Sequence, residues 1–360
     1  ALQLWNEHSG AFTLSNGQQW ENDPVTCSLN CWPGELAYFW IERIRWRYIH
    51  DPDSWNGFDA DEKDAIHHFI EDEGDFSRPV WTALLVNINM LHSLDKEDVE
   101  SWLFDLMGKA GTEFIWNSIL PNPNFNIRLI DIFFYKSCID EFEYLSHLSE
   151  YKRQSFLLQV FRMITYGELK EKQRTRLLSK VVTVENGAYA ALFMDQVAWA
   201  FEFRLDSKDR DMVWDLWLHQ FIEDRHAGKR RNWGEEERVA FAKLVPLLGA
   251  HLKEGAEYLS DSFPKVTGYD LNETIMLDNI DCIPQECAEA FIAFYKRLFM
   301  QPGVFHVWKA EELLQKLANK FGMDKVSSLA SLAKEKRIIP DTWNFSPKKE
   351  IHSDGKEGEA

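Results

Sequence analysis

The residues best suited to bind a charged partner lie close together between Trp214 and Arg238. An amphipathic pattern ends in an arginine and a histidine, three consecutive cations follow, and then a tryptophan and a glutamate. The candidate binding residues are Arg225, His226, Lys229, Arg230, Arg231, Trp233 and Glu237. Guanidinium and ammonium groups at this density suit carboxylate or phosphate partners. The stretch therefore predicts a contact site for an acidic partner or a phosphate.

The same charges also fit the electrostatics of a corner between two helices. The large apolar residues of this stretch, at helical spacing, predict a stripe that faces a core; they are Trp214, Trp217, Leu218, Phe221 and Ile222. Gly228 is placed to end that helix, with Glu223–Arg225 expected at its solvated edge. The cations at 229–231 would follow the negative helix end, and the acids at 235–237 would begin the next helix.

A second constellation could bind a metal ion. Asp64, His68 and Asp72 are spaced i, i+4 and i+8, so one helix face could present them to a divalent ion. Together with the cluster at 223–226, they support an alternative function as a metal-assisted hydrolase. A solvated acidic helix face explains the same spacing without a metal, because no H-E-x-x-H motif is present.

Signatures of nucleotide and nucleophile chemistry are absent from the sequence. It contains no P-loop, no G-x-S-x-G elbow, no kinase motif set and no G-x-G-x-x-G turn. The N-I-D string at 279–281 stands without the glycine-rich turn that a dinucleotide site needs. The five cysteines lack the spacing of a zinc ribbon and are expected to be small buried residues. We therefore expect no cofactor and no catalytic residue set within this chain.

The elements that position these residues are helical throughout. Apolar residues recur at helical spacing in about a dozen segments, and strand-like alternation is nearly absent. The predicted fold is all-α, either a HEAT-like solenoid of stacked helix pairs or a large helical bundle. We expect an irregular segment at 1–34, a helical array at 35–267, a C-terminal helical subdomain at 268–343 and a mobile charged tail at 344–360.

Composition narrows the class of partner. Hydrophobic residues make up 45% and aromatic residues 14% of the 360 residues, which is ample for a large core. The formal net charge of −18 disfavours nucleic acid as a partner, so binding of nucleic acid through the basic and aromatic stretch at 229–233 is kept only as a further alternative. The chain has no signal-like or membrane-spanning apolar run, and we expect a cytoplasmic protein.

The stretch W-L-H-Q-F-I-E-D-R-H-A-G, followed by Glu235–Glu237 and L-L-G-A-H-L-K-E-G-A-E-Y-L, resembles a helical domain of unknown function. This domain is attached C-terminally to bacterial sirtuin-like antiphage defence proteins, and the resemblance covers about residues 125–338. It implies a helical sensing or assembly region beside an NAD-consuming effector outside this chain. It carries over no functional residue, and the sirtuin-like catalytic domain itself is missing here.

These observations predict a helical protein-interaction or regulatory module. Because the chain begins at Ala1 rather than at a methionine, it is expected to be a piece of a longer protein, and the resemblance implies that this is a bacterial antiphage defence protein. Its expected partner is a protein, either an effector domain or a phage component. The abundance of aromatic side chains fits this role, since they serve as anchors in interfaces as well as in cores.

Overall fold

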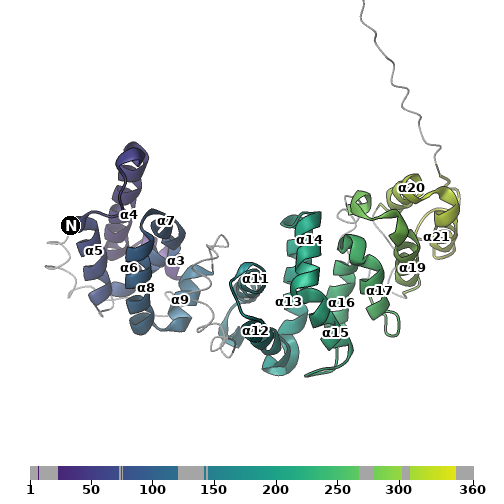
Figure 1. The fold of residues 1–360 in the computed structure, drawn as a ribbon, viewed down its shortest axis with the longest axis horizontal. Helices are drawn as coiled ribbons and strands as arrows, with labels where there is room; N and C mark the ends of the chain where they lie inside the picture. Colours follow the sequence, from purple (N-terminus) through teal and green to yellow (C-terminus); the bar gives the residue numbers. More distant parts are fainter. Residues whose placement is uncertain are drawn as a thin grey trace, which may run out of the picture. The chain divides into compact units, whose positions relative to one another are not determined.

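Helices account for all the regular secondary structure that the structure describes. The computed structural model describes Glu7 and residues 23–72, 74, 76–120, 142, 145–266, 277, 279–301 and 309–345. Within these residues the backbone forms α-helices, short 3₁₀ turns and a π-helical segment, with no strand (Figure 1). The prediction of an all-α fold is confirmed; the form of the array stays a prediction.

The chain divides into two compact units, Ala1–Lys180 and Val181–Ala360. The boundary lies within one helix, α12 (Glu171–Thr183), inside the stretch that sequence patterns grouped as a single array. Each unit has a buried core of its own, and the two are described separately.

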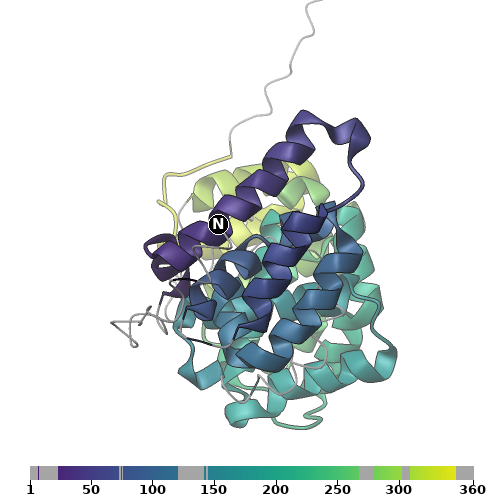
Figure 2. The same ribbon diagram turned by 90° about the vertical axis from the view of Figure 1, so that its left-hand side faces the viewer.

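The first unit is built around a helix that is apolar on almost all sides. Its helices are α3 (Pro24–Leu29), α4 (Trp32–His50), α5 (Ala60–Glu71), α6 (Ser77–Val86), α7 (Ile88–Leu94), α8 (Lys96–Ala110), α9 (Thr112–Ile119), α11 (Glu150–Tyr166) and most of α12. Helix α6 contacts α3, α4, α5 and α9, and residues 79–85 along it are all buried. Such all-round apolarity is typical of a central helix. In Figure 2 the long purple helix α4 leads through a turn into α5.

The second unit consists of helices packed in successive pairs. They are α13 (Ala188–Phe203), α14 (Ser207–Val213), α15 (His219–His226), α16 (Glu235–Leu244), α17 (Leu252–Tyr258), α19 (Ala288–Phe299), α20 (Ala310–Phe321) and α21 (Met323–Glu335). Helix α13 packs on α16, α17 on α19, and α20 on α21. The apolar side chains on these helices are buried, among them Phe193, Phe241, Phe291 and Leu314.

Several predicted boundaries are wrong for identifiable reasons. The segment predicted to be irregular at 1–34 contains helix α3, whose cap Asp23 accepts a hydrogen bond from the Thr26 amide at 3.0 Å. This helix begins with Pro24, whose fixed backbone angle suits a first turn. The helix predicted at 234–250 ends at Leu244, and two 3₁₀ turns follow. Pro246, which lacks an amide hydrogen, lies in the first of these turns.

Other predicted elements lie largely outside the described residues. These are most of the helix predicted at 125–148, part of the connection at 268–284 and the tail from 346 onward.

Candidate interaction site

The helix that carries the predicted site contains an extra-wide turn. It runs without interruption from α14 into a π-helical segment, Trp214–Leu218, and on into α15. The five residues of the predicted stripe are all buried, so the core-facing assignment of Trp214, Trp217, Leu218, Phe221 and Ile222 is confirmed. A π-helical turn inserts one residue into the helical repeat and is found frequently at functional sites.

Helix α15 ends in a Schellman motif at the predicted glycine. The Lys229 amide donates to the Asp224 carbonyl at 2.9 Å, and the Gly228 amide donates to the Arg225 carbonyl at 3.0 Å. Gly228 has a φ of +68°, in the left-handed region that this motif requires and that glycine adopts without a steric penalty. The corner between two helices is therefore confirmed. We call its connection, residues 227–234, the basic loop.

Arg225 holds the basic loop from inside. Its Nε and Nη2 donate to the two carboxylate oxygens of Glu237 at 2.7 and 2.9 Å. Its Nη1 donates to the carbonyls of Lys229 at 3.2 Å and Arg231 at 2.9 Å, and its Nη2 donates to that of Asn232 at 3.3 Å. A guanidinium has five N–H donors, so its capacity is fully used. One buried side chain thus fixes the end of α15, the loop backbone and the first turn of α16.

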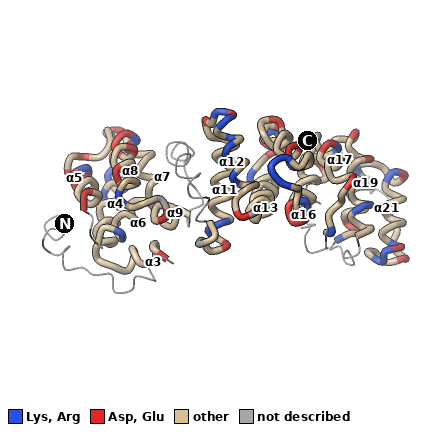
Figure 3. Tube along the Cα trace, turned by 90° about the horizontal axis from the view of Figure 1, so that it is seen from below, with Lys and Arg blue, Asp and Glu red and all other residues tan. Residues whose placement is uncertain are grey.

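The cations of the basic loop face the solvent. Lys229, Arg230 and Arg231 are exposed, and they form the blue loop beside α16 in Figure 3. Lys229 is held by Asp224, with Nζ 2.7 Å from Oδ1. Arg230 and Arg231 make no ion pair with any described residue. Arg230 also has a φ of +69°, a backbone conformation that costs about 1 kcal/mol for a residue other than glycine.

The seven predicted site residues separate into two groups. Arg225 and Glu237 are 1% and 4% exposed, and they bind each other. The expectation that Arg225 lies at the solvated edge is therefore wrong, because the side chain turns inward to the carboxylate. Trp233 is buried against Phe241, so its ring is not exposed for stacking on a base. His226 is exposed and touches Trp233 edge-on. The three consecutive cations remain as the exposed contact surface.

A polar cluster that sequence patterns did not reveal braces the π-helical segment. The Trp214 ring is stacked with the imidazoles of His219 and His251, whose centroids lie 5.4 and 5.5 Å from it. Its indole N–H donates to Glu254 Oε2 at 3.2 Å, and His219 Nε2 lies 2.8 Å from Glu254 Oε1 and 3.0 Å from the Tyr258 hydroxyl. Burial raises the pKa of this hydroxyl above its usual value. The cluster ties the wide turn to α17.

The predicted metal-binding face does not continue along one helix. Asp64 and His68 lie on α5, which ends at Glu71, and Asp72 has extended backbone angles (φ −72°, ψ 137°). In the part of the chain that the structure describes, no three His, Cys, Asp or Glu side chains gather as a metal ion requires. The first turn of α5 has a structural role instead: its capping box pairs Asp59 with Glu62, and Arg47 binds the buried Glu62 carboxylate at 2.7 Å.

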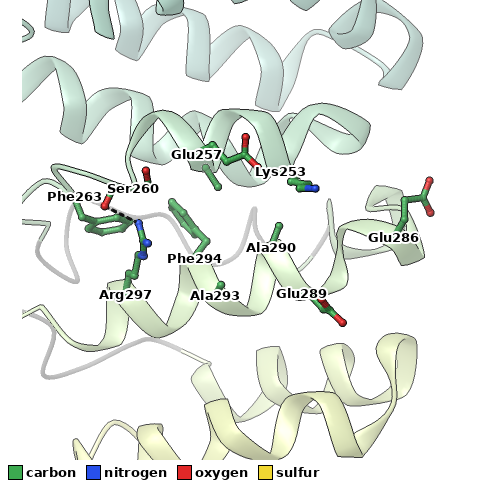
Figure 4. A pocket seen from close by; sticks show the side chains of 11 residues that line it. Lys253, Glu257, Ser260, Phe263, Glu286, Glu289, Ala290, Ala293, Phe294 and Arg297 are labelled. Atoms are coloured by element: carbon green, nitrogen blue, oxygen red, sulfur yellow. Dashed lines mark hydrogen bonds between the residues drawn. The ribbon is translucent and has the colours of Figure 1, made fainter. Parts of the chain in front are cut away.

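Two exposed apolar surfaces complete the set of candidate contacts. On α4, Phe39, Trp46 and Ile49 are 57–59% exposed and are spaced seven and three residues apart, so they share one helix face. In the other unit, a groove of about 370 Å³ runs between α17 and α19 (Figure 4). Neither surface was predicted from the sequence, because periodicity shows which face is apolar and not whether a neighbour covers it.

Comparisons with known proteins give no further guide: no family model, curated protein or solved structure matches this chain. No helix in the described residues is long and apolar enough to cross a membrane.

Proposed function

We propose that this chain is a helical protein-interaction module that docks an acidic segment of a protein partner on the basic loop. The observation that carries the proposal is the arrangement around Arg225. All five of its donors are committed to Glu237 and to loop carbonyls, so the loop backbone is held while three cations project from it. A contact surface ordered before binding loses less conformational entropy when the partner arrives.

Charge supports an acidic partner. The net charge of −18 repels anions over most of the surface, so three consecutive cations form a local site of opposite sign. Their attraction would guide an acidic segment to this place and orient it there. The unpaired Arg230 offers the planar fork that binds carboxylates in a bidentate manner. The burial of Trp233 removes the aromatic platform that the nucleic-acid alternative needs.

The resemblance to the helical domain of sirtuin-like defence proteins suggests where such a module works. We propose that it belongs to a larger bacterial antiphage defence protein. Its acidic partner is then an effector domain of the same system or a phage component. Docking at the basic loop would hold or release that effector.

The test measures binding of a fluorescein-labelled 12-residue peptide of Asp and Glu by anisotropy at 50–300 mM NaCl. We expect binding that weakens as salt rises, and that weakens about tenfold in Lys229→Glu/Arg230→Glu. Arg231 is left unchanged because its guanidinium packs on Gly187. The matched control, Lys170→Glu/Lys172→Glu, reverses two exposed cations in the other unit and should leave binding within twofold.

Two results would refute the proposal. One is the absence of binding at 50 mM NaCl; the other is equal loss in the control variant. A labelled single-stranded oligonucleotide provides the competing arm. If it bound more tightly than the acidic peptide, and through the same two cations, the nucleic-acid alternative would replace the proposed one.

A further inference from the structure

The groove between α17 and α19 has the shape and lining of a helix-binding site. Its floor is made of small side chains, Ala256 on α17 with Ala290 and Ala293 on α19. Such small residues allow another backbone to approach closely. At one end Phe263 and Phe294 meet with ring centroids 5.5 Å apart and form an apolar wall. Figure 4 shows these rings and Arg297 at one end of the groove and Glu286 at the other.

The charged residues along the groove are unevenly placed: Glu286 and Glu289 outnumber Lys253 toward one end, and Arg297 lies at the other end, with Glu257 between Lys253 and Arg297. Arg297 Nη1 donates to the Ser260 carbonyl at 3.1 Å, and this is the one hydrogen bond that the Arg297 guanidinium makes to a described residue. The rest of the guanidinium is open to a carboxylate of a ligand. Arg297 follows Glu286 by eleven positions, from the 3₁₀ turn before α19 to near the end of that helix, which corresponds to about 16 Å along a helix. An acidic group is therefore favoured at the Arg297 end and disfavoured at the Glu286 end.

The Arg297 end also lies toward the basic loop. The Lys265 amide donates to the Glu235 carboxylate at 2.7 Å, so the segment after α17 is bound to the first residue of α16. Glu235 follows the basic loop directly, and Phe263 of the groove is two residues before Lys265. The half-buried Arg297 and the exposed Lys265 therefore lie on the side of the groove from which the chain reaches the first turn of α16, where the exposed Glu235 follows the loop. A single partner could contact the groove and the loop together.

We propose that the groove binds an amphipathic helix of a protein partner, whose apolar face lies on the alanine floor and whose acidic end reaches Arg297. This inference rests on the proposed function, because the acidic segment that continues from the helix is the one that the basic loop receives. Helix-in-groove recognition uses apolar anchors at i, i+3, i+4 and i+7. Two helical turns span about 11 Å and fit between the charged ends.

The experiment selects 20-residue peptides from a display library against the immobilised chain. The library has helical apolar spacing and random charges at both ends. We expect enriched sequences to be acidic at one fixed end. In Ala293→Trp, which fills the floor from an exposed position, their affinity should fall at least tenfold. The matched control Ser328→Trp adds an exposed tryptophan on α21 and should bind as the unaltered chain does.

The outcomes separate this inference from the function on which it rests. If enriched peptides lose affinity in Lys229→Glu/Arg230→Glu but not in Ala293→Trp, the loop docks acidic segments and the groove is not the site. If no sequence is enriched, or if the enriched ends are basic, the groove proposal is overturned. Concentration-dependent self-association that Ala293→Trp abolishes would also overturn it, because a second copy of the chain would then be the occupant.

Discussion

Replacing Arg225 by methionine should destabilise the second unit and release the basic loop. Methionine fills similar space but leaves the Glu237 carboxylate buried without its partner, which typically costs about 3–5 kcal/mol. The three loop carbonyls add little, since residues 229–232 are exposed and water can replace the lost donor. A domain has about 5–15 kcal/mol of stability, so the loss is a large share of it.

The second substitution identifies the source of that loss. In Arg225→Met/Glu237→Leu both charges are removed, and apolar replacement of a buried ion pair is often close to neutral. We expect the double variant to unfold within about 2 kcal/mol of the unaltered chain. Its loop should stay mobile, however, because nothing replaces the bonds to the Lys229, Arg231 and Asn232 carbonyls. Stability and loop order would thus be separated.

Urea unfolding followed by circular dichroism measures the first effect, and the rate of native-state trypsin cleavage after residues 229–231 measures the second. Cleavage should accelerate at least tenfold in both variants. Arg45→Met is the control: among the described residues this exposed arginine pairs with Glu42 alone, at 3.5 Å, and its loss should cost under about 0.5 kcal/mol. The reasoning fails if Arg225→Met costs under about 1 kcal/mol, or if loop cleavage is unchanged.

Three further predictions test the second unit. Burial raises the pKa of Glu202 from 4.5 to about 7, so ionisation of this carboxyl disfavours the folded state. The free energy of unfolding, measured with urea at each pH, should therefore fall by about 1–2 kcal/mol between pH 4.5 and pH 7.5. Glu202→Gln should remove this contribution to the pH dependence. Gly187 has a φ of +79° and Arg231 packs on it, so Gly187→Ala should lower the melting temperature measured by calorimetry by several degrees; an unchanged value would contradict the contact. Burial raises the pKa of the Cys287 thiol, so a chromogenic disulfide should modify the exposed Cys282 at least tenfold faster than Cys287. Cys282→Ser should remove the fast phase of the reaction. Equal rates for the two cysteines would argue against the burial of Cys287.

Local signals explain what the sequence could predict about the corner. Gly228 as the helix end, the acidic first turn at 235–237 and the buried tryptophan stripe each depend on a few neighbouring residues. The inward turn of Arg225 depends on Glu237, twelve residues later, and on three backbone carbonyls that carry no sequence signature. Sequence reasoning therefore located the corner and misassigned its central side chain.

The groove illustrates a second limit. Its two walls belong to α17 and α19, which are separated by about thirty residues that include the segment predicted as a connection. Periodicity correctly indicated a helix at 284–299. It could not show that alanines at 290 and 293 would face a gap, since small residues serve equally well in a packed interface. The exposed face of α4 escaped prediction for the same reason.

Arg225 binds the backbone of the basic loop, and this restricts the ways in which the binding specificity of the loop can change. The guanidinium donates hydrogen bonds to backbone carbonyl oxygens, which are present whatever side chains the loop carries. Substitutions at 229 and 230 would therefore alter partner choice without disturbing the hydrogen bonds from Arg225, whereas the Arg231 side chain also packs on Gly187. Insertions or deletions there would move the oxygens out of reach. The length of the basic loop is thus constrained, and a change of binding partner is expected to come from exchanged side chains and not from a change in loop length.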